Sequence, residues 1–197
     1  MPSEQTDPTP NDSRMTRQAL RRVVDERLLE ARFQPIVELR RGRIAAYECL
    51  SRPSSDSGFG DALSLFDAAE NESMLWDIEG VARGQSFNAA SEWPEGVLLF
   101  MNCSPQVICD ERFLASLRDG VKQAGISTRR VVIEITERSD EQADTGVLDQ
   151  VQQLRDEGYQ IAIDDVGAGT SGLNRIMSIR PSWLKLDRAL VANIDQD

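Results

Sequence analysis

The chain has 197 residues, of which 22 are Lys or Arg, 33 are Asp or Glu and none is histidine. Without histidine, a Ser-His-Asp or Cys-His catalytic pair is excluded, and so is a zinc or iron site that uses histidine ligands. The net charge of -11 argues against nucleic-acid polymers and anionic membranes as partners, because both are bound through Lys and Arg side chains at phosphates.

The three cysteines, Cys49, Cys103 and Cys109, form no CxxC pair, so neither a disulfide framework nor a cysteine-rich zinc site is expected. No segment approaches the roughly 20 apolar residues of a membrane span, and the first residues lack the basic and apolar regions of a signal peptide. These features favour a cytoplasmic globular protein.

Residues 1–15 are rich in Pro, Ser, Thr, Asp and Asn without hydrophobic periodicity, so we expect a disordered tail ahead of one domain over 16–197. From Arg17, apolar residues recur at helical spacing, which predicts an amphipathic helix. The remaining expected elements are strands over 33–39 and 43–52, helices over 62–71 and 73–90, a strand over 97–102, a helix over 111–125, a strand over 130–136, a helix over 146–158, a strand over 159–164, a helix over 173–179 and a strand over 183–187.

The order of these elements predicts an α/β fold. The first two strands are separated by a very short Gly-containing connection, as an antiparallel hairpin requires. The later strands alternate with helices, which is typical of a parallel sheet with crossover connections. Six strands are expected in all.

Polar side chains interrupt the apolar strands within them or at their C-terminal ends: Glu48, Asn102, Glu134, Asp164 with Asp165, and Lys185 with Asp187. In α/β folds these strand ends converge on one rim, where active sites are built. Carboxylates gathered so closely repel one another unless cations neutralise them, and oxygen ligands without histidine suit Mg²⁺, Mn²⁺ or Ca²⁺. The pattern therefore favours a metal-dependent site for phosphoryl chemistry.

Each of these residues also has an ordinary structural interpretation. A single Glu48 or Glu134 in a strand is usually a solvated side chain, Asp165 could cap a turn, and Lys185 could pair with Asp187. Glu134, however, shares a strand face with apolar side chains in a strand expected to be covered on both sides. Because such interruptions recur in five strands, the structural interpretation does not account for the whole set.

A second motif points to a different class of protein. Gly167, Gly169 and Gly172 spell G-x-G-x-x-G after a strand, which formally matches the fingerprint of a dinucleotide-binding Rossmann fold, with Asp187 at the spacing of a ribose-binding acid. Asp164 and Asp165 directly precede the first glycine, however, and place two negative charges where a pyrophosphate would approach. We therefore keep a Rossmann-type nucleotide binder only as a third hypothesis, behind the two that are stated at the end of this section.

Five segments, FQPIVELRRGRIAAYECLSR, LLFMNCSP, VVIEITE, IAIDDVGAGTSG and LKLDRALV, resemble in order and spacing the motifs of the EAL-domain cyclic di-GMP phosphodiesterases. The resemblance covers the chain from about Phe33 to its C-terminus. It implies a modified TIM barrel with an antiparallel first strand, and a bacterial signalling enzyme that hydrolyses one phosphodiester of cyclic di-GMP to linear pGpG. Members of the family commonly dimerise, so a homodimer is also expected.

By motif position, the resemblance implies that Glu48, Asn102, Glu134 and Asp164 are metal ligands and that Asp165 lies at a second metal. Glu48 and Asp165 thereby also serve catalysis. The two ions, Mg²⁺ or Mn²⁺, would polarise the phosphoryl group, lower the pKa of a bridging water and stabilise the leaving oxygen.

Further roles follow from the same resemblance. Lys185 matches the lysine that orients or deprotonates the attacking water, and Glu137 matches the residue that anchors the loop after Asp165. Gln34, Arg52 and Asp187 match substrate contacts, with Arg52 directed at a phosphate.

The chain also departs from the family pattern. Cys49 replaces the usual Ala after Glu48, a change of one small residue for another. The family loop Asp-Asp-Phe-Gly-Thr-Gly-Tyr-Ser becomes Asp-Asp-Val-Gly-Ala-Gly-Thr-Ser, which loses two aromatic side chains and one hydroxyl. Family members continue through two more strand-helix units, so the resemblance implies an incomplete barrel with exposed sheet edges unless a partner covers them.

Two functional hypotheses therefore lead. The first is an EAL-type phosphodiesterase, favoured by Glu48, Asn102, Glu134, Asp164 and Lys185. The second is an inactive EAL-like module that binds cyclic di-GMP or a protein partner, favoured by the altered loop and the expected absence of the last strands.

Overall fold

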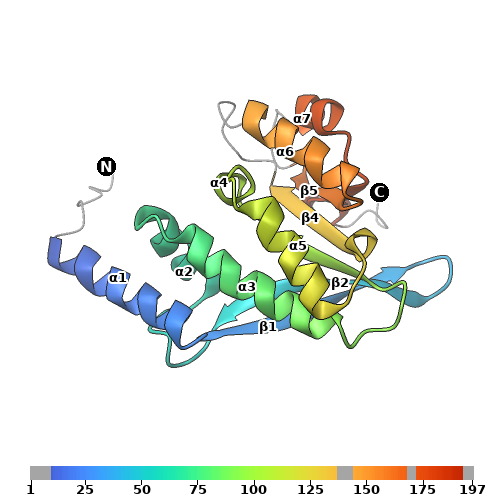
Figure 1. Cartoon of the computed structure of the whole chain (residues 1–197). Helices are drawn as coiled ribbons and strands as arrows, with labels where there is room; N and C mark the ends of the chain where they lie inside the picture. The colour runs from blue at the N-terminus through green and yellow to red at the C-terminus, as the bar shows by residue number, and fades with distance from the viewer. Residues whose placement is uncertain (1–9, 137–143, 168–171, 193–197) are drawn as a thin grey trace. The chain divides into compact units, whose positions relative to one another are not determined.

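The predicted alternation of strands and helices is confirmed in a computed structural model, which describes residues 10–136, 144–167 and 172–192 (Figure 1). The chain divides into two units. One comprises the residues up to Arg32 together with Ser51–Ala82, and the other comprises Phe33–Leu50 and the residues from Arg83 onward. None of the helices in the described part of the chain combines the length and the apolar character that crossing a membrane requires.

The first unit contains α1 (Pro10–Asp25) and α2 (Ala62–Asn71). Helix α2 begins at a capping box, in which the Asp61 carboxylate accepts the Ser64 N–H at 2.8 Å. The apolar faces of both helices meet in a core formed by Leu20, Val23, Leu29, Leu65, Ala69, Met74 and Ile78. Burial of such side chains is the main stabilising contribution in a unit of this size.

The start of α1 differs from the expected end of the disordered tail at residue 15. The helix begins at Pro10, because proline fits the first turn of a helix, where its missing N–H is not needed. Ser13 also donates a hydrogen bond to Glu72, which follows α2 directly. Residues 1–9 lie outside the described part of the chain.

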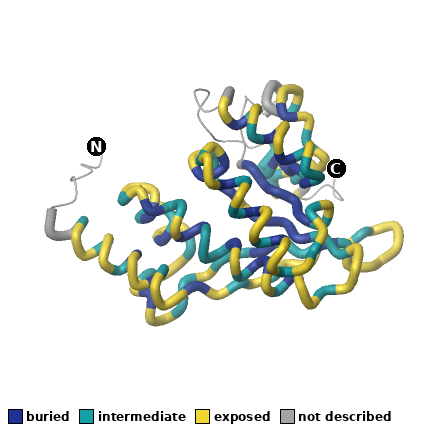
Figure 2. Tube along the Cα trace, viewed as in Figure 1, coloured by how far each residue is buried: buried dark blue, intermediate teal, exposed yellow. Residues whose placement is uncertain are grey.

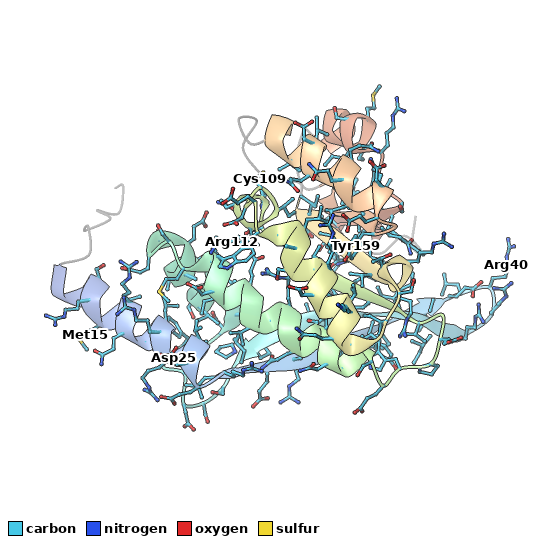
Figure 3. All side chains as sticks on the ribbon, in the orientation of Figure 1. Met15, Asp25, Arg40, Cys109, Arg112 and Tyr159 are labelled. Atoms are coloured by element: carbon cyan, nitrogen blue, oxygen red, sulfur yellow. The ribbon has the colours of Figure 1, made fainter. Side chains whose placement is uncertain are left out.

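The sheet has six strands in the order β1-β2-β3-β4-β5-β6. The antiparallel hairpin expected at its start is present, with Arg40 in the connection between its strands (Figure 3). From β2 onward each strand pairs in parallel with the next. The strands are β1 (Leu29–Glu38), β2 (Arg43–Pro53), β3 (Leu98–Asn102), β4 (Val131–Thr136), β5 (Gln160–Val166) and β6 (Trp183–Leu186).

This sequential order overturns the Rossmann alternative. A Rossmann sheet starts in its middle and reverses direction, so its strand order is not the chain order. Here every crossover advances to the neighbouring strand on the same side, as in a TIM barrel. The G-x-G-x-x-G match is therefore a coincidence of spacing, and the modified TIM-barrel class is confirmed for the six strands present.

The two faces of the second unit's sheet carry different side chains. One face holds a small apolar cluster of Ala46, Phe100, Val132 and Ala162. Alternate residues such as Leu99, Ile133 and Ile161 are fully buried on the other face, and Figure 2 shows the central strands as buried. The helices and the 3₁₀ turn outside the first unit are α3 (Leu75–Ala90, which begins in that unit), α4 (Pro105–Ile108), α5 (Phe113–Ala124), η1 (Thr128–Arg130), α6 (Asp144–Asp156), α7 (Gly172–Ile179) and α8 (Arg188–Val191).

Apolar side chains are exposed on β6, at one edge of the six-stranded sheet. Leu184 and Leu186 are 48% and 56% exposed, respectively. At the hairpin, Val37 is half-exposed and Leu39 projects almost completely into solvent. Little of the hydrophobic stabilisation available to these side chains is realised within the described residues.

Candidate functional site

The parallel strands bring their polar residues to one end of the sheet. In the register, Glu48 lies beside Phe100, Asn102 beside Glu134, and Thr136 beside Asp164. Because the side chains of a strand alternate between its two faces, Glu48, Glu134 and Asp164 project from the same face as the small apolar cluster. The parallel strands thus place polar side chains at one end of this face, next to the small apolar cluster, which we call the apolar floor.

Three carboxylates meet at this end of the sheet. Glu48, Glu134 and Asp164 each offer one oxygen, and these three oxygens lie within 4.8 Å of one another. Lys185 reaches the same point from β6, with Nζ 3.0 Å from Glu48 Oε2 and 2.9 Å from Glu134 Oε1 and Asp164 Oδ2. We call Glu48, Glu134 and Asp164 the carboxylate triad.

Two neighbouring groups orient the triad. The Asn102 side chain, at the end of β3, donates from Nδ2 to Glu48 Oε1 at 3.2 Å. The backbone N–H of Asp165 donates to Asp164 Oδ1 at 2.9 Å, which leaves the other oxygen of Asp164 for Lys185. Glu48 and Asp164 are therefore each held by a hydrogen-bond donor in addition to Lys185.

Burial dominates the electrostatics of the site. Glu134 is 1% exposed, and its removal from water raises its pKa to about 8, although the charge of Lys185 lowers it and the charge of Glu48 raises it. For Lys185, burial by itself lowers the pKa, but the charge of Glu134 and hydrogen bonds to all three carboxylates raise it overall. The cluster thus concentrates negative charge that one ammonium compensates only in part.

Asp165 occupies a strained part of the backbone. Its φ of 58° is in the left-handed region, which a non-glycine residue rarely adopts. The pairing between β5 and β6 shifts register between Ile163 and Val166, so the strain coincides with a bulge. Strained residues of this kind cluster at functional sites, and this one directly follows Asp164.

The segment after the bulge packs closely against α8. Gly167 has a φ of 101°, and a Cβ placed on it would come within 2.1 Å of Leu190 Cδ1. The exposed Leu190 side chain could rotate away, but the positive φ would strain any residue with a side chain, so glycine is favoured there. The rest of the altered loop, residues 168–171, lies outside the described part of the chain.

The other predicted site residues have local surroundings of their own or lie outside the described part of the chain. The Asp187 carboxylate accepts the Ala189 N–H at 2.6 Å and caps α8, a structural role the sequence pattern did not suggest. Gln34 is exposed on β1. Arg52 is exposed, belongs to the first unit and donates to the Ser51 carbonyl. Glu137 lies outside the described residues.

Cys49 projects from the face opposite Glu48. It is buried, and the Ser86 hydroxyl of α3 donates to its sulfur at 2.9 Å. Desolvation raises the pKa of the thiol, so it stays protonated and behaves as a small apolar group. The replacement of the family's Ala by Cys is therefore accommodated on the helix side of the sheet.

The triad has the chemistry of a site for a hard divalent cation. All donors are oxygens, and Glu134 Oε2 is buried with no hydrogen-bond donor among the described residues. A buried carboxylate oxygen without a donor costs free energy that a cation would recover. Glu48, Glu134 and Asp164 thus fit Mg²⁺ or Mn²⁺, with the Asn102 amide beside them.

Comparison with known proteins identifies relatives of the same fold. A probable cyclic di-GMP phosphodiesterase of Escherichia coli, PdeG, is 26% identical over 95% of this chain. The structure of the EAL enzyme Bd1971 bound to cAMP and cyclic di-GMP aligns over 96% of this chain with a TM-score of 0.83 and 26% identity. A manganese and cyclic di-GMP complex of Klebsiella pneumoniae BlrP1 aligns over 85% with a TM-score of 0.74 and 28% identity.

These relatives are longer than the present chain. It spans 38% of the length of PdeG, 54% of the Bd1971 chain and 42% of the BlrP1 chain. The family model of the EAL domain nevertheless matches residues 17–197, almost the whole chain. The chain therefore belongs to the EAL domain family.

Proposed function

We propose that this chain hydrolyses cyclic di-GMP to linear pGpG, with the reaction at the carboxylate triad of a single EAL domain within 16–197. Hydrolysis adds water across one P–O bond of the ring. The water oxygen bonds to phosphorus, the bond from phosphorus to the ribose 3′ oxygen breaks, and that oxygen leaves as a hydroxyl. The observation that carries this proposal is the convergence of Glu48, Glu134 and Asp164 around Lys185.

Divalent cations belong to the proposal. The groups that would hold them are the triad and Asn102, with Asp165 at a second ion. When bound, Mg²⁺ or Mn²⁺ supplies positive charge that polarises a phosphoryl oxygen and makes water more acidic. The support from this chain is its all-oxygen donor set and the buried Glu134 oxygen that lacks a donor among the described residues.

The chain's own residues provide orientation and charge. Lys185 has its ammonium among the carboxylates, where Nζ can donate to the attacking water or, after losing a proton, accept one from it. The apolar floor beneath the triad lowers the local dielectric and so strengthens each of these interactions. Gln34, Arg52 and Asp187 remain proposed substrate contacts, with Arg52 at a phosphate, and Glu137 remains a proposed anchor of the loop.

The direct test is incubation of the chain with cyclic di-GMP and Mn²⁺ or Mg²⁺, followed by chromatographic measurement of pGpG. We expect product that disappears when a chelator is added and when Glu48 is replaced in Glu48→Gln. Glu95→Gln, an exposed substitution in the segment before β3, serves as the matched control and should remain active. Product formation that is unaffected by chelator or by Glu48→Gln would contradict the proposal.

A second candidate is an EAL module that binds cyclic di-GMP without hydrolysing it. One observation favours it: Lys185 forms ion pairs with all three members of the triad, which compensates part of their charge without a metal. Equilibrium dialysis with cyclic di-GMP separates the candidates. Binding without product in the presence of Mn²⁺ would support the module and count against the enzyme.

A further inference from the structure

Trp183 lies two residues before Lys185 on β6, and both side chains project from the same face of the sheet. We propose that Trp183 is a positioning residue, which holds the register of β6 and thereby keeps the Lys185 ammonium among the carboxylates. The inference rests on the proposed function only in assigning Lys185 to the reaction. The geometric claim about Lys185 stands independently of it.

The indole ring is fixed first by a neighbouring aromatic side chain. The centroids of the Trp183 and Phe100 rings are 5.5 Å apart at an interplanar angle of 70°, an edge-to-face arrangement. Phe100 is almost fully buried in the apolar cluster below the triad. An edge-to-face pair of this kind is attractive beyond the apolar area that it buries.

A hydrogen-bond relay fixes the ring a second time. The Trp183 Nε1–H donates to Gln160 Oε1 at 2.8 Å, and Gln160 Nε2 donates to the Arg129 carbonyl at 2.7 Å. Arg129 belongs to the 3₁₀ turn that leads into β4. The relay therefore connects β6 across β5 to the backbone beside β4, the strand that carries Glu134.

The strand needs such an anchor because its other contacts specify the register weakly. Strand β6 has four residues and, among the described strands, pairs only with β5. That pairing shifts register between Ile163 and Val166, next to the position of Lys185. A slip of one residue would turn Lys185 to the opposite face of the sheet. The half-exposed Leu184 and Leu186 contribute little burial that would oppose the slip.

The chain offers a direct readout of the lysine's position. Lys122 and Lys185 are its two lysines, and Lys122 is exposed on α5. In the intact chain, an amine-acylating reagent followed by mass spectrometry should label Lys185 about tenfold more slowly than Lys122, because its ammonium is held by three carboxylates. Because both lysines are in the same chain, the ratio of the two rates does not depend on the reagent concentration or the amount of protein.

Variants at Trp183 should raise the labelling rate of Lys185 relative to Lys122, and the rise should be larger the more of the Trp183 contacts are lost. Trp183→Leu removes both the ring contact and the relay, and should raise the labelling rate of Lys185 toward that of Lys122. Trp183→Phe keeps a ring against Phe100 and should give an intermediate rate. Trp93→Leu is the matched control, because Trp93 packs against Phe33 and Tyr47 in a separate aromatic group, and should leave the ratio unchanged.

Two further measurements keep the test decisive. If Trp183→Leu does not fold, as judged by circular dichroism, Gln160→Met breaks the relay alone and should also raise Lys185 labelling. In the enzyme assay, the folded Trp183 variants should lower kcat with little change in KM. Labelling needs neither metal nor substrate, so its outcome is separate from the test of hydrolysis. Unchanged Lys185 protection in folded Trp183→Phe and Gln160→Met would overturn the inference.

Discussion

Lys185 Nζ lies 2.9 Å from Glu134 Oε1, and the Glu134 side chain is completely shielded from solvent. This ion pair is therefore asymmetric, since the carboxylate is buried while the lysine retains some exposure. Breaking a buried pair by removing one partner costs more than the pair contributes, because the remaining charge stays desolvated. The two members should therefore respond differently to substitution.

Replacing the cation should destabilise the fold. In Lys185→Met the three carboxylates of the triad face one another without an ammonium, so we expect the free energy of unfolding to fall by about 3 kcal/mol. Turnover should fall at least about 100-fold if Lys185 acts on the attacking water. Urea unfolding and the pGpG assay measure the two effects. Lys122→Met should stay within about 0.5 kcal/mol of the wild type, and equal stability of both variants would contradict the account.

Neutralising the buried carboxylate should leave the stability of the fold nearly unchanged and abolish the effect of the metal. Glu134→Gln keeps the shape of the side chain and removes a charge that burial disfavours, so stability without metal should stay within about 1 kcal/mol of the wild type. The increase in melting temperature on adding Mn²⁺ should disappear, because a triad ligand is lost. Calorimetry with and without Mn²⁺ tests both points, and a retained Mn²⁺ effect would remove Glu134 from the metal site.

Helix packing in the second unit predicts a contrast between two glycines. A Cβ at Gly120 of α5 would come within 2.4 Å of the Phe87 ring, whereas one at Gly84 of α3 meets no atom within 4 Å. Gly120→Ala should lower the free energy of unfolding by about 1–3 kcal/mol through overpacking. Gly84→Ala should raise it by up to about 1 kcal/mol, because alanine is the better helix former. Equal effects in urea unfolding would contradict this packing.

Tyr159, directly before β5 (Figure 3), predicts a loss of stability at alkaline pH. Burial, followed by the charge of Glu157, raises its pKa to about 12 from an ordinary value of 10, while the charge of Arg118 lowers it. Below pH 10 the phenol is neutral in both the folded and unfolded chain. Between pH 10 and 12 only the unfolded chain loses the proton, so the free energy of unfolding should fall as pH rises, by about 2 kcal/mol.

Tyr159→Phe tests that assignment. The Tyr159 hydroxyl is buried without a hydrogen-bond partner among the described residues, so its removal should leave stability at pH 7 unchanged or slightly higher. The variant should also lose most of the decline between pH 10 and 12 in urea unfolding followed by circular dichroism. A decline as steep as that of the wild type would assign it to other groups.

Much of this architecture could be predicted from residue patterns. Runs such as VVIEIT and YQIAID are apolar, β-branched and separated by helical segments, so both the strands and their parallel order follow from periodicity. The position of Glu134 within such a run indicated a buried charge. The resemblance of five motifs identified the family, which the EAL family model confirms.

Other features depend on contacts that periodicity does not encode. The bulge at Asp165 arises from the pairing of β5 with β6, and neither strand alone indicates it. Asp187 could be assigned to substrate by motif, whereas its hydrogen bond to Ala189 shows that it also caps a helix. The relay from Trp183 through Gln160 joins residues that no local pattern connects. Helix α1 also begins earlier than predicted, because Pro10 suits a first helical turn.

The central claim, that the triad around Lys185 binds a divalent cation, is tested most directly by titrating Mn²⁺ into the chain and counting bound ions by electron paramagnetic resonance. The account predicts saturable Mn²⁺ binding by the wild type, loss of that binding in both Glu48→Gln and Asp164→Asn, and retention in Glu95→Gln. Equal Mn²⁺ binding by the wild type and the triad variants would contradict it.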